Sequence, residues 1–259
     1  MKLHFYKYQG TGNDFILLDN RDGAITLNTQ QIARLCDRRF GIGADGLMLL
    51  EQSTGYDFRM VYYNADGNES TMCGNGGRCI TAFAKKLGIV EESVNFLAID
   101  GKHHATFHTD GTISLHMQDV TDIINESGHT ILNTGSPHYV VFVDDVQTTD
   151  VFAQGRSIRN QQAFQPKGIN VNFVQQMSDG IWVRTYERGV EDETLSCGTG
   201  VTASAIAYHN NDSNGHFSVN IKTPGGKLNV RFDKDSLASA KNVVLTGPAT
   251  YVYEGDVVL

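Results

Sequence analysis

The stretch Met72-Cys73-Gly74-Asn75-Gly76-Gly77-Arg78-Cys79 recurs in shorter form as Ser196-Cys197-Gly198-Thr199-Gly200-Val201 in the second half of the chain. Each copy places a cysteine directly before Gly-x-Gly. Each then continues into an alanine-rich run of small residues that predicts a buried helix. We therefore predict that the Cys73 and Cys197 thiols face each other across one substrate.

Other segments of the two halves match in the same order. The offset between them is 123 residues from Gly12 to Gly135 and 125 residues from Gly101 to Gly226. Chance likeness between glycine-rich turns would not preserve this order, so the pattern indicates duplication of a whole domain. The matching segments are Gly10–Ile16 with Asn133–Tyr139, Tyr63-Asn64 with Tyr186-Glu187, Glu69–Cys73 with Glu193–Cys197, and Asp100–Lys102 with Gly225–Lys227.

The duplication predicts an α/β (α+β) fold of two pseudo-symmetric lobes. Each lobe is expected to be a curled, mostly antiparallel sheet wrapped around a central helix, with the active site in the cleft between the lobes. We expect residues 1–118 to form the first lobe, with residues 249–259 returning to it, and residues 119–248 to form the second. The boundary is placed where residues 119–128 become polar.

Local patterns fill in this outline. Thr29–Arg39 predicts a helix capped by Asn28 or Thr29, with Ile32, Leu35, Cys36 and Phe40 on one face. Cys36 is then simply a small buried hydrophobic residue. Apolar, β-prone runs predict strands over Phe5–Tyr8, Phe15–Asp19, Phe58–Tyr63, His104–His108, Thr112–His116, Val140–Val143, Val171–Val174, Ile181–Arg184 and Leu228–Phe232.

The composition is typical of a soluble globular protein. Of its 259 residues 40% are hydrophobic and 19% charged, and 29 Asp and Glu against 21 Lys and Arg give a net charge of −8. Without a basic run, nucleic acid is not an expected partner. No signal-type or membrane-length apolar run occurs, so we expect a cytoplasmic protein without membrane contact. Four cysteines without zinc-type spacing predict neither a disulfide scaffold nor a metal site.

Cys73 and Cys197 are predicted to lie at helix N-termini. Unpaired N–H groups and the positive end of the helix dipole gather there. They can lower a cysteine pKa from about 8.5 into the range of roughly 3.5–7.5, and they can hold a carboxylate. One thiolate can then remove an α-hydrogen while the opposite thiol protonates the other face, which inverts a stereocentre. No lysine stands in a pyridoxal-phosphate context, so this chemistry is expected to be cofactor-free. The competing explanation, tight packing of small residues, is weakened by the matched positions, whereas Cys79 is interpreted as core.

The residues around Cys73 resemble the signature of the diaminopimelate epimerase family. Asn64–Asn68 reads Asn-Ala-Asp-Gly-Asn, with Asn68 in place of the usual serine, and after four further residues Cys73–Arg78 reads Cys-Gly-Asn-Gly-Gly-Arg. The resemblance spans essentially the whole chain. It implies a small-molecule substrate and a pyridoxal-independent reaction that interconverts LL- and meso-2,6-diaminopimelate for lysine and peptidoglycan precursor synthesis; by analogy it also implies a homodimer. Further matching segments are Gly10–Phe15, Gly41–Gly46, Glu187–Gly189 and Cys197–Gly200.

The resemblance also assigns roles to single residues. Cys73 and Cys197 would be the acid/base pair, and backbone N–H groups of Gly74-Asn75 and Gly198-Thr199 would hold the reacting carboxylate. The second amino acid head would be recognised without inversion, with Arg188 suited to a carboxylate and Glu187 to an ammonium. The residues matching substrate-binding positions are Asn13, Asn64, Gly74, Asn75, Asn170, Glu187, Arg188, Gly198 and Thr199.

Three further positions receive a weaker role or none. His138 would orient a catalytic thiol, although a lone histidine is more often structural. Ser136 stands where many members have an asparagine that contacts substrate. Gly46 stands where some members have a binding glutamine, so no role is assigned to it.

Two alternatives remain open at this point. One is a proline or hydroxyproline racemase of the same fold, which also uses two cysteines and no cofactor. A cyclic imino acid would leave Glu187 and Arg188 unpaired, so diaminopimelate is favoured. The other is a non-catalytic binder or isomerase, against which the retention of both cysteines argues.

Overall fold

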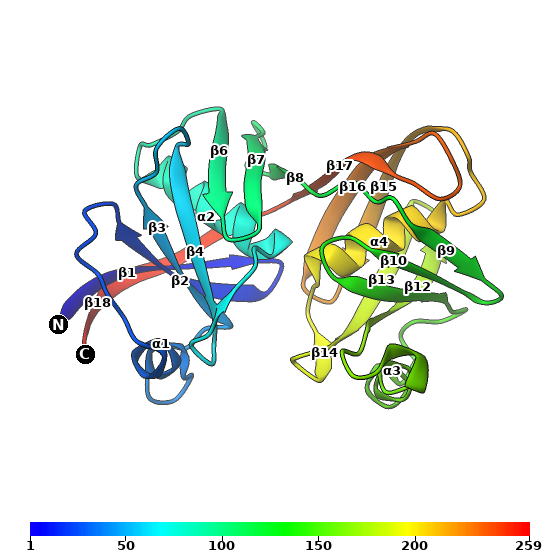
Figure 1. Cartoon of the computed structure of the whole chain (residues 1–259), viewed down its shortest axis with the longest axis horizontal. Helices are drawn as coiled ribbons and strands as arrows, with labels where there is room; N and C mark the ends of the chain where they lie inside the picture. Colours follow the sequence, from blue (N-terminus) through cyan, green and yellow to red (C-terminus); the bar gives the residue numbers. More distant parts are fainter. The chain divides into compact units, whose positions relative to one another are not determined.

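The computed structural model describes all 259 residues, Met1–Leu259. The chain divides into two compact units: Met1–Leu115 together with Gly247–Leu259, and His116–Thr246. The sequence placed these divisions at 118/119 and 248/249. Within the first unit the C-terminal strand lies beside the N-terminal one, as the red and blue strands of Figure 1 show. No helix is long and apolar enough to cross a membrane.

The first unit is a sheet in the order β18-β1-β2-β3-β4-β6-β7-β8. The β2–β3 and β4–β6 pairs are parallel, and the other pairs in this order are antiparallel. Short β5 adds to the side of β4. The elements are β1 (Lys2–Gly10), β2 (Asn13–Asn20), α1 (Thr29–Cys36), β3 (Gly46–Glu51), β4 (Phe58–Asn64), β5 (Glu69–Ser70), α2 (Gly74–Lys86), β6 (Ser93–Ala98), β7 (Gly101–Phe107), β8 (Ile113–His116) and β18 (Thr250–Val258).

The second unit repeats that order as β9-β10-β11-β12-β13-β15-β16-β17. Its parallel pairs are β11–β12 and β13–β15, at the same two places, and short β14 adds to β13. Equal strand order and equal direction of every pair confirm the predicted duplicated α/β fold. The elements are β9 (Ile123–Glu126), β10 (His129–Asn133), β11 (Pro137–Phe142), α3 (Val151–Arg159), a 3-10 turn (Gln162–Phe164), β12 (Asn170–Met177), β13 (Gly180–Glu187), β14 (Asp192–Thr194), α4 (Gly198–Tyr208), β15 (Gly215–Thr223), β16 (Gly226–Lys234) and β17 (Lys241–Gly247).

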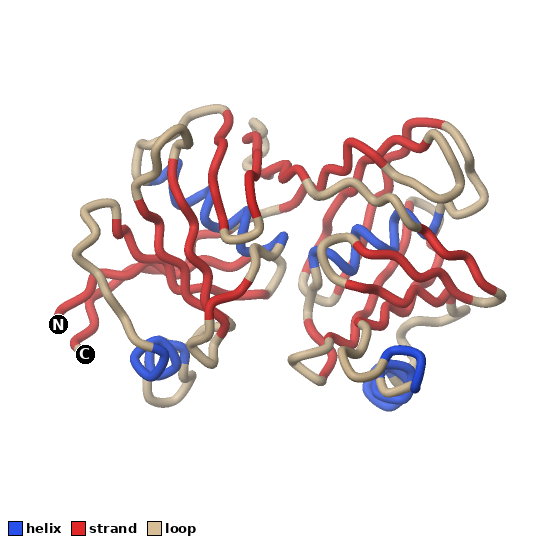
Figure 2. Tube along the Cα trace, in the orientation of Figure 1, coloured by secondary structure: helices blue, strands red, loops and turns tan.

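Each unit surrounds one small-residue helix with strands. The blue traces of α2 and α4 run among red strands in Figure 2, and most residues of both helices are buried. A second helix, α1 or α3, covers the opposite face of each sheet and packs on its own hydrophobic cluster. Because both faces of β2 are covered, Phe15, Ile16, Leu17 and Leu18 are all fully buried, although successive side chains point to opposite faces.

Helix boundaries are where the sequence predictions need correction. Helix α1 is capped by Asn28, as predicted, but it ends at Cys36 instead of Arg39. Phe40 was predicted on its buried face and is instead 68% exposed, because it follows the helix in a turn. Helix α3 was not predicted. It alternates small, polar and apolar residues, and only Val151 and Gly155 in it are buried.

Candidate active site

Cys73 and Cys197 occupy the same structural position in the two units. Each is the N-cap of its helix, α2 or α4, and each has the extended backbone that this position requires. All four cysteines of the chain are free thiols, with Cys73 half-buried and Cys197 7% exposed. The prediction that both thiols lie at helix N-termini is therefore confirmed.

The glycine three residues after each cysteine is required by packing. A Cβ on Gly76 would lie 2.7 Å from the Met48 side chain of β3. A Cβ on Gly200 would lie 2.4 Å from the Asn172 side chain of β12. Since β3 and β12 are equivalent strands, the Gly-x-Gly pattern lets both helix N-termini approach the sheet at the same point.

The bonds made by the two sulfurs differ. Cys73 Sγ accepts a hydrogen bond from the Gly76 backbone N–H at 3.2 Å. Cys197 makes no such cap bond, and its Sγ lies 3.4 Å from the Thr199 hydroxyl. The thiol of the first unit is thus held by its own helix backbone, and that of the second contacts a side-chain hydroxyl.

In the first unit, the structure brings the predicted residues Asn13 and Asn75 together. Asn75, the second residue of α2, donates from Nδ2 to Asn13 Oδ1 at 3.4 Å. Asn13 begins β2 and donates to Asp45 Oδ2 at 2.6 Å. Behind Asn75 lies Arg78, fully buried, whose Nη2 donates to Asn75 Oδ1 at 3.0 Å. Asn64 is placed at the exposed end of β4, where its carbonyl accepts from the Gly67 N–H.

In the second unit, a chain of side chains leads to Cys197. Asn172 Nδ2 donates to the Tyr139 carbonyl at 3.2 Å, and its Oδ1 accepts from the Thr185 hydroxyl at 2.9 Å. The amide orientation is therefore fixed, and Nδ2 also donates to His138 Nδ1 at 3.1 Å. A neutral His138 ring accepting at Nδ1 carries its hydrogen on Nε2, which lies 2.9 Å from the Thr199 hydroxyl.

This chain leaves the Thr199 hydroxyl hydrogen available for a bond to sulfur. Because the His138 Nε2–H donates to Thr199 Oγ1, that oxygen acts as acceptor, and its own hydrogen can point to Cys197 Sγ. The pKa of the fully buried His138 side chain is lowered to about 3, mainly by burial and also by the nearby Arg188 charge, while the Asn172 hydrogen bond opposes the shift. His138 is consequently neutral at physiological pH.

The other predicted residues of the second unit form a second cluster. Asn170, at the start of β12, donates to Ser136 Oγ at 2.9 Å and accepts from the Arg188 N–H at 2.9 Å. The Arg188 guanidinium reaches Ser136 Oγ at 3.4 Å. Glu187, the last residue of β13, accepts from the Thr194 hydroxyl at 3.1 Å.

The remaining two cysteines lie in the core. Burial raises the pKa of the Cys36 thiol to about 12 and that of Cys79 above its usual range. Both are therefore protonated at neutral pH, as expected for structural cysteines. Arg78, beside Cys79, has its pKa lowered to about 10 by burial, while Cys79 and Cys73 act to raise it.

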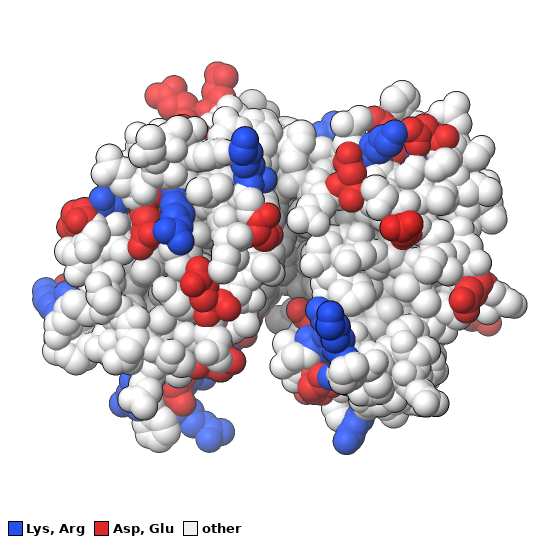
Figure 3. Space-filling view, viewed as in Figure 1, with Lys and Arg blue, Asp and Glu red and all other residues white.

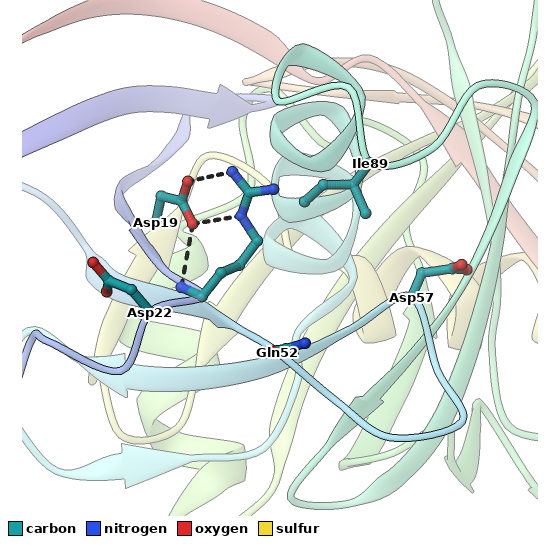
Figure 4. A pocket seen from close by; sticks show the side chains of 6 residues that line it. Asp19, Asp22, Gln52, Asp57 and Ile89 are labelled. Atoms are coloured by element: carbon teal, nitrogen blue, oxygen red, sulfur yellow. Dashed lines mark hydrogen bonds and ion pairs between the residues drawn. The ribbon is translucent and has the colours of Figure 1, made fainter.

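Two further features of the protein are its surface charge and a pocket that the predicted site residues do not line. On the face shown in Figure 3, acidic and basic side chains are interspersed, without an extended area of one sign. Figure 4 shows an open pocket of about 510 Å³ in the first unit, lined by Asp19, Arg21, Asp22, Gln52, Asp57 and Ile89. None of the predicted site residues lines it, and Arg21 is engaged by Asp19 at 2.6 Å. No group of three or more His, Cys, Asp and Glu side chains is arranged to hold a metal ion.

Sequence reasoning assigned no role to four polar residues of these networks: Asp45, Arg78, Asn172 and Thr185. Arg78 and Asp45 stand inside the quoted motifs, so their place in the motif was a usable signal. Asn172 and Thr185 were hidden in strand patterns, where a polar residue at a core-facing position was the signal that could have marked them.

The family model of diaminopimelate epimerase matches residues 5–122 and 130–252. The chain belongs to this family. A diaminopimelate epimerase of Flavobacterium psychrophilum is 53% identical over 256 residues, covering 98% of this chain and 99% of its own. One of Chlorobaculum tepidum is 40% identical over 259 residues, covering 96% and 99%.

Solved structures support the fold of this diaminopimelate epimerase family member. A phenazine biosynthesis protein of the PhzF family from Bacillus anthracis aligns with a TM-score of 0.77, at 14% identity and full coverage of both chains. A hydroxyproline epimerase from Agrobacterium vitis aligns with a TM-score of 0.69, at 15% identity, covering 100% of this chain and 93% of its own. At such identities the likeness concerns the fold alone.

Proposed function

We propose that the protein is a diaminopimelate epimerase that interconverts LL- and meso-2,6-diaminopimelate by cofactor-free proton transfer between two cysteines. The observation that carries this proposal is the equivalence of Cys73 and Cys197. In two copies of one domain, each thiol caps the helix that a family motif opens. Two such copies facing a common substrate would supply one thiol to each side of the α-carbon.

The proposed step balances without any further reagent. One cysteine, as thiolate, takes the α-proton and becomes a thiol, while the C–H electron pair stays on the α-carbon and delocalises into the carboxylate. The other cysteine, as thiol, gives its proton to the opposite face and becomes a thiolate. The two sulfurs end with exchanged protonation states, and the reverse reaction begins from that state.

The helix N-termini would stabilise the developing charge. The first-turn N–H groups at Gly74-Asn75 and Gly198-Thr199 have no acceptor within their own helices. A carboxylate held by them gains negative charge as the α-proton leaves, and one well-placed donor of this kind is worth about 2.7–4 kcal/mol. The loops would thus serve the reaction chiefly through the carboxylate.

The second amino acid head of the substrate would bind Asn64 of the first unit and the cluster of Asn170, Glu187 and Arg188 in the second unit. The side-chain oxygen of Asn170 accepts from the Arg188 backbone N–H, and the Ser136 hydroxyl contacts the Arg188 guanidinium. A guanidinium suits a carboxylate, and the Glu187 carboxylate suits an ammonium. These charges favour diaminopimelate over a cyclic imino acid, which has only one such head.

His138 would orient and tune the second thiol through Thr199. Neutral His138 donates to the Thr199 hydroxyl, whose hydrogen can then stabilise the thiolate form of Cys197.

The decisive experiment follows the α-position by NMR after incubation with LL-diaminopimelate in deuterated water. We expect deuterium at the α-carbon together with formation of the meso isomer. Absence of both with the wild-type protein would refute the proposed function. Exchange with trans-4-hydroxy-L-proline instead would support the alternative racemase.

We also propose a cytoplasmic, homodimeric enzyme. Free thiols are the form that a reducing compartment maintains, and the family resemblance implies the dimer. Light scattering during size-exclusion chromatography tests the dimer, and a single species of about 28.5 kDa would contradict it.

A further inference from the structure

Arg78 is a buried cation without a carboxylate partner. Its side chain is 0% exposed and takes part in no ion pair. Its guanidinium donates from Nη1 to the Gly74 carbonyl at 3.0 Å and from Nε to the Pro248 carbonyl at 3.2 Å. Burying a charge among neutral groups is costly, and apolar residues often fill such sites equally well or better. The position therefore points to a task beyond packing.

That task is visible in the contact with Asn75. A guanidinium has only donors, so the Asn75 oxygen must face Arg78, as the 3.0 Å bond from Nη2 to Oδ1 shows. The Asn75 amide nitrogen is thereby turned the other way. It donates to Asn13 Oδ1 at 3.4 Å.

The negative charge of Asp45 fixes the orientation of the Asn13 amide. An ionised carboxylate has only acceptors, so Asp45 Oδ2 binds the amide nitrogen of Asn13, at 2.6 Å. The Asn13 oxygen is thereby turned toward Asn75. Asp45 is itself held by Arg38, whose Nη2 lies 2.7 Å from its Oδ1.

The four residues form one chain in which every donor points the same way. It runs from the Arg78 cation through Asn75 and Asn13 to the Asp45 anion, with bonds of 3.0, 3.4 and 2.6 Å. Flipping either amide would place two donors or two acceptors against each other. The middle bond is the longest, and hence the weakest, of the three.

We propose that Arg78 and Asp45 are positioning residues that lock these two asparagines in opposite orientations for substrate binding. Asn75 then offers an N–H to a substrate carboxylate, and Asn13 offers a carbonyl oxygen to a substrate ammonium. The proposal rests on the proposed function, since it specifies which amide atom of Asn75 and of Asn13 faces the substrate of that function. It predicts that loss of Arg78 weakens binding through Asn75, without direct contact between Arg78 and substrate.

The kinetic test is a double-mutant cycle. Arg78→Met should raise KM for diaminopimelate about ten- to hundredfold with a much smaller change in kcat, and Arg78→Lys should raise it less. In an Asn75→Ala background, Arg78→Met should change KM by less than about twofold, because its route is already absent. Arg21→Gln, in an exposed ion pair of the same unit, is the matched control and should leave both constants unchanged.

A spectroscopic test is independent of activity. The side-chain amide resonances of Asn75 and Asn13, identified by their loss in Asn75→Asp and Asn13→Asp, should both shift in Arg78→Lys and in Asp45→Asn. Unmoved resonances, or a KM effect of Arg78→Met that persists in the Asn75→Ala background, would overturn the proposal. If the wild type lacks epimerase activity, the proposed function fails while the resonances still decide the positioning role. Should Arg78→Met not fold, Arg78→Lys and Asp45→Asn carry both readouts.

Discussion

The Cys73 loop and the Cys197 loop share a backbone and differ in what lies behind it. In both, the cysteine caps a helix, and the glycine three residues later packs against the equivalent strand, β3 or β12. Behind the first loop the polar group is a buried cation, Arg78, carried by the helix itself. Behind the second it is a neutral imidazole, His138, carried by the sheet.

The sheets differ at three equivalent positions. In the first unit these positions are apolar or aromatic and buried; in the second they are joined by hydrogen bonds. Register identifies them, because Met48 and Asn172 lie opposite Tyr62 and Thr185 in equivalent strand pairs. The equivalent pairs are Phe15 and His138, Met48 and Asn172, and Tyr62 and Thr185.

This difference separates what the duplication preserved from what it allowed to change. Both units keep the backbone arrangement that places a cysteine at a helix N-terminus, since it depends only on the backbone and on one glycine. The polar support diverged, because any fully satisfied network can occupy buried positions behind a helix. The two thiols are thereby given different surroundings.

The largest expected effect is loss of either thiol. Cys73→Ala and Cys197→Ala should each lower epimerisation by about 10³-fold, because both faces of the α-carbon need a proton-transfer group. Each variant should still exchange deuterium at one configuration, since its remaining thiol can remove and return a proton on one face. NMR with the LL and meso isomers should show that the two variants exchange opposite configurations.

Cys36→Ala is the matched control for these variants. Its thiol is buried in the core, with a pKa raised to about 12, so epimerisation should be unchanged. If both single-thiol variants exchanged the same configuration, the two sulfurs would not serve opposite faces.

The next largest effect is expected from loss of the Thr199 hydroxyl, which belongs to the Cys197 loop. Thr199→Val keeps the backbone N–H and the side-chain shape but removes the link between His138 and Cys197. We expect kcat/KM to fall about ten- to hundredfold, the size of a hydrogen bond to a charged group. Thr199→Ser retains the hydroxyl and should stay within a few-fold of wild type; equal losses in both variants would contradict the role of the hydroxyl.

The two equivalent glycines should respond unequally to alanine. At Gly200 the new methyl meets Asn172 at 2.4 Å, inside a hydrogen-bonded network. At Gly76 it meets the end of Met48 at 2.7 Å, a flexible side chain that can move. Urea unfolding should show a loss of about 1–3 kcal/mol for Gly200→Ala and a smaller one for Gly76→Ala. A larger loss for Gly76→Ala would show that the hydrogen-bonded side chains facing Gly200 accommodate a methyl group more easily than Met48 does.

The positions of the two cysteines were predictable from the sequence, and the hydrogen-bonded side chains behind them were not. The Gly-x-Gly spacing located both thiols at helix N-termini, and the nearly constant offset revealed the duplicated fold, because these depend on local pattern and repetition. The hydrogen-bonded set of His138, Asn172 and Thr185 could not be predicted from the sequence in the same way. Asn172 and Thr185 stand in strands whose apolar neighbours set the pattern, and their partners are fixed only by the register between strands. The prediction that Phe40 lies on a buried helix face was wrong for a related reason, since the helical periodicity of the sequence continues past the residue at which the helix ends.

A last expected effect concerns the pH dependence of stability. Burial lowers the pKa of His138 from 6.5 to about 3, so between these values the unfolded chain binds a proton that the folded protein does not. This contribution to stability is complete above pH 6.5 and is lost as the pH falls, by up to about 1.4 kcal/mol per pH unit. Urea unfolding at pH 6.5, 5.5 and 4.5 should show that slope in the wild type.

His138→Gln should flatten this slope. The window avoids Asp14, where burial acts to raise the pKa but Arg38 and Lys7 lower it to about 2, so that its contribution is lost only at lower pH. Equal slopes in the wild type and in His138→Gln would mean that the imidazole is protonated in the folded state. The second loop would then carry a cation behind its thiol, as the first loop does with Arg78, and the contrast between the two units would disappear.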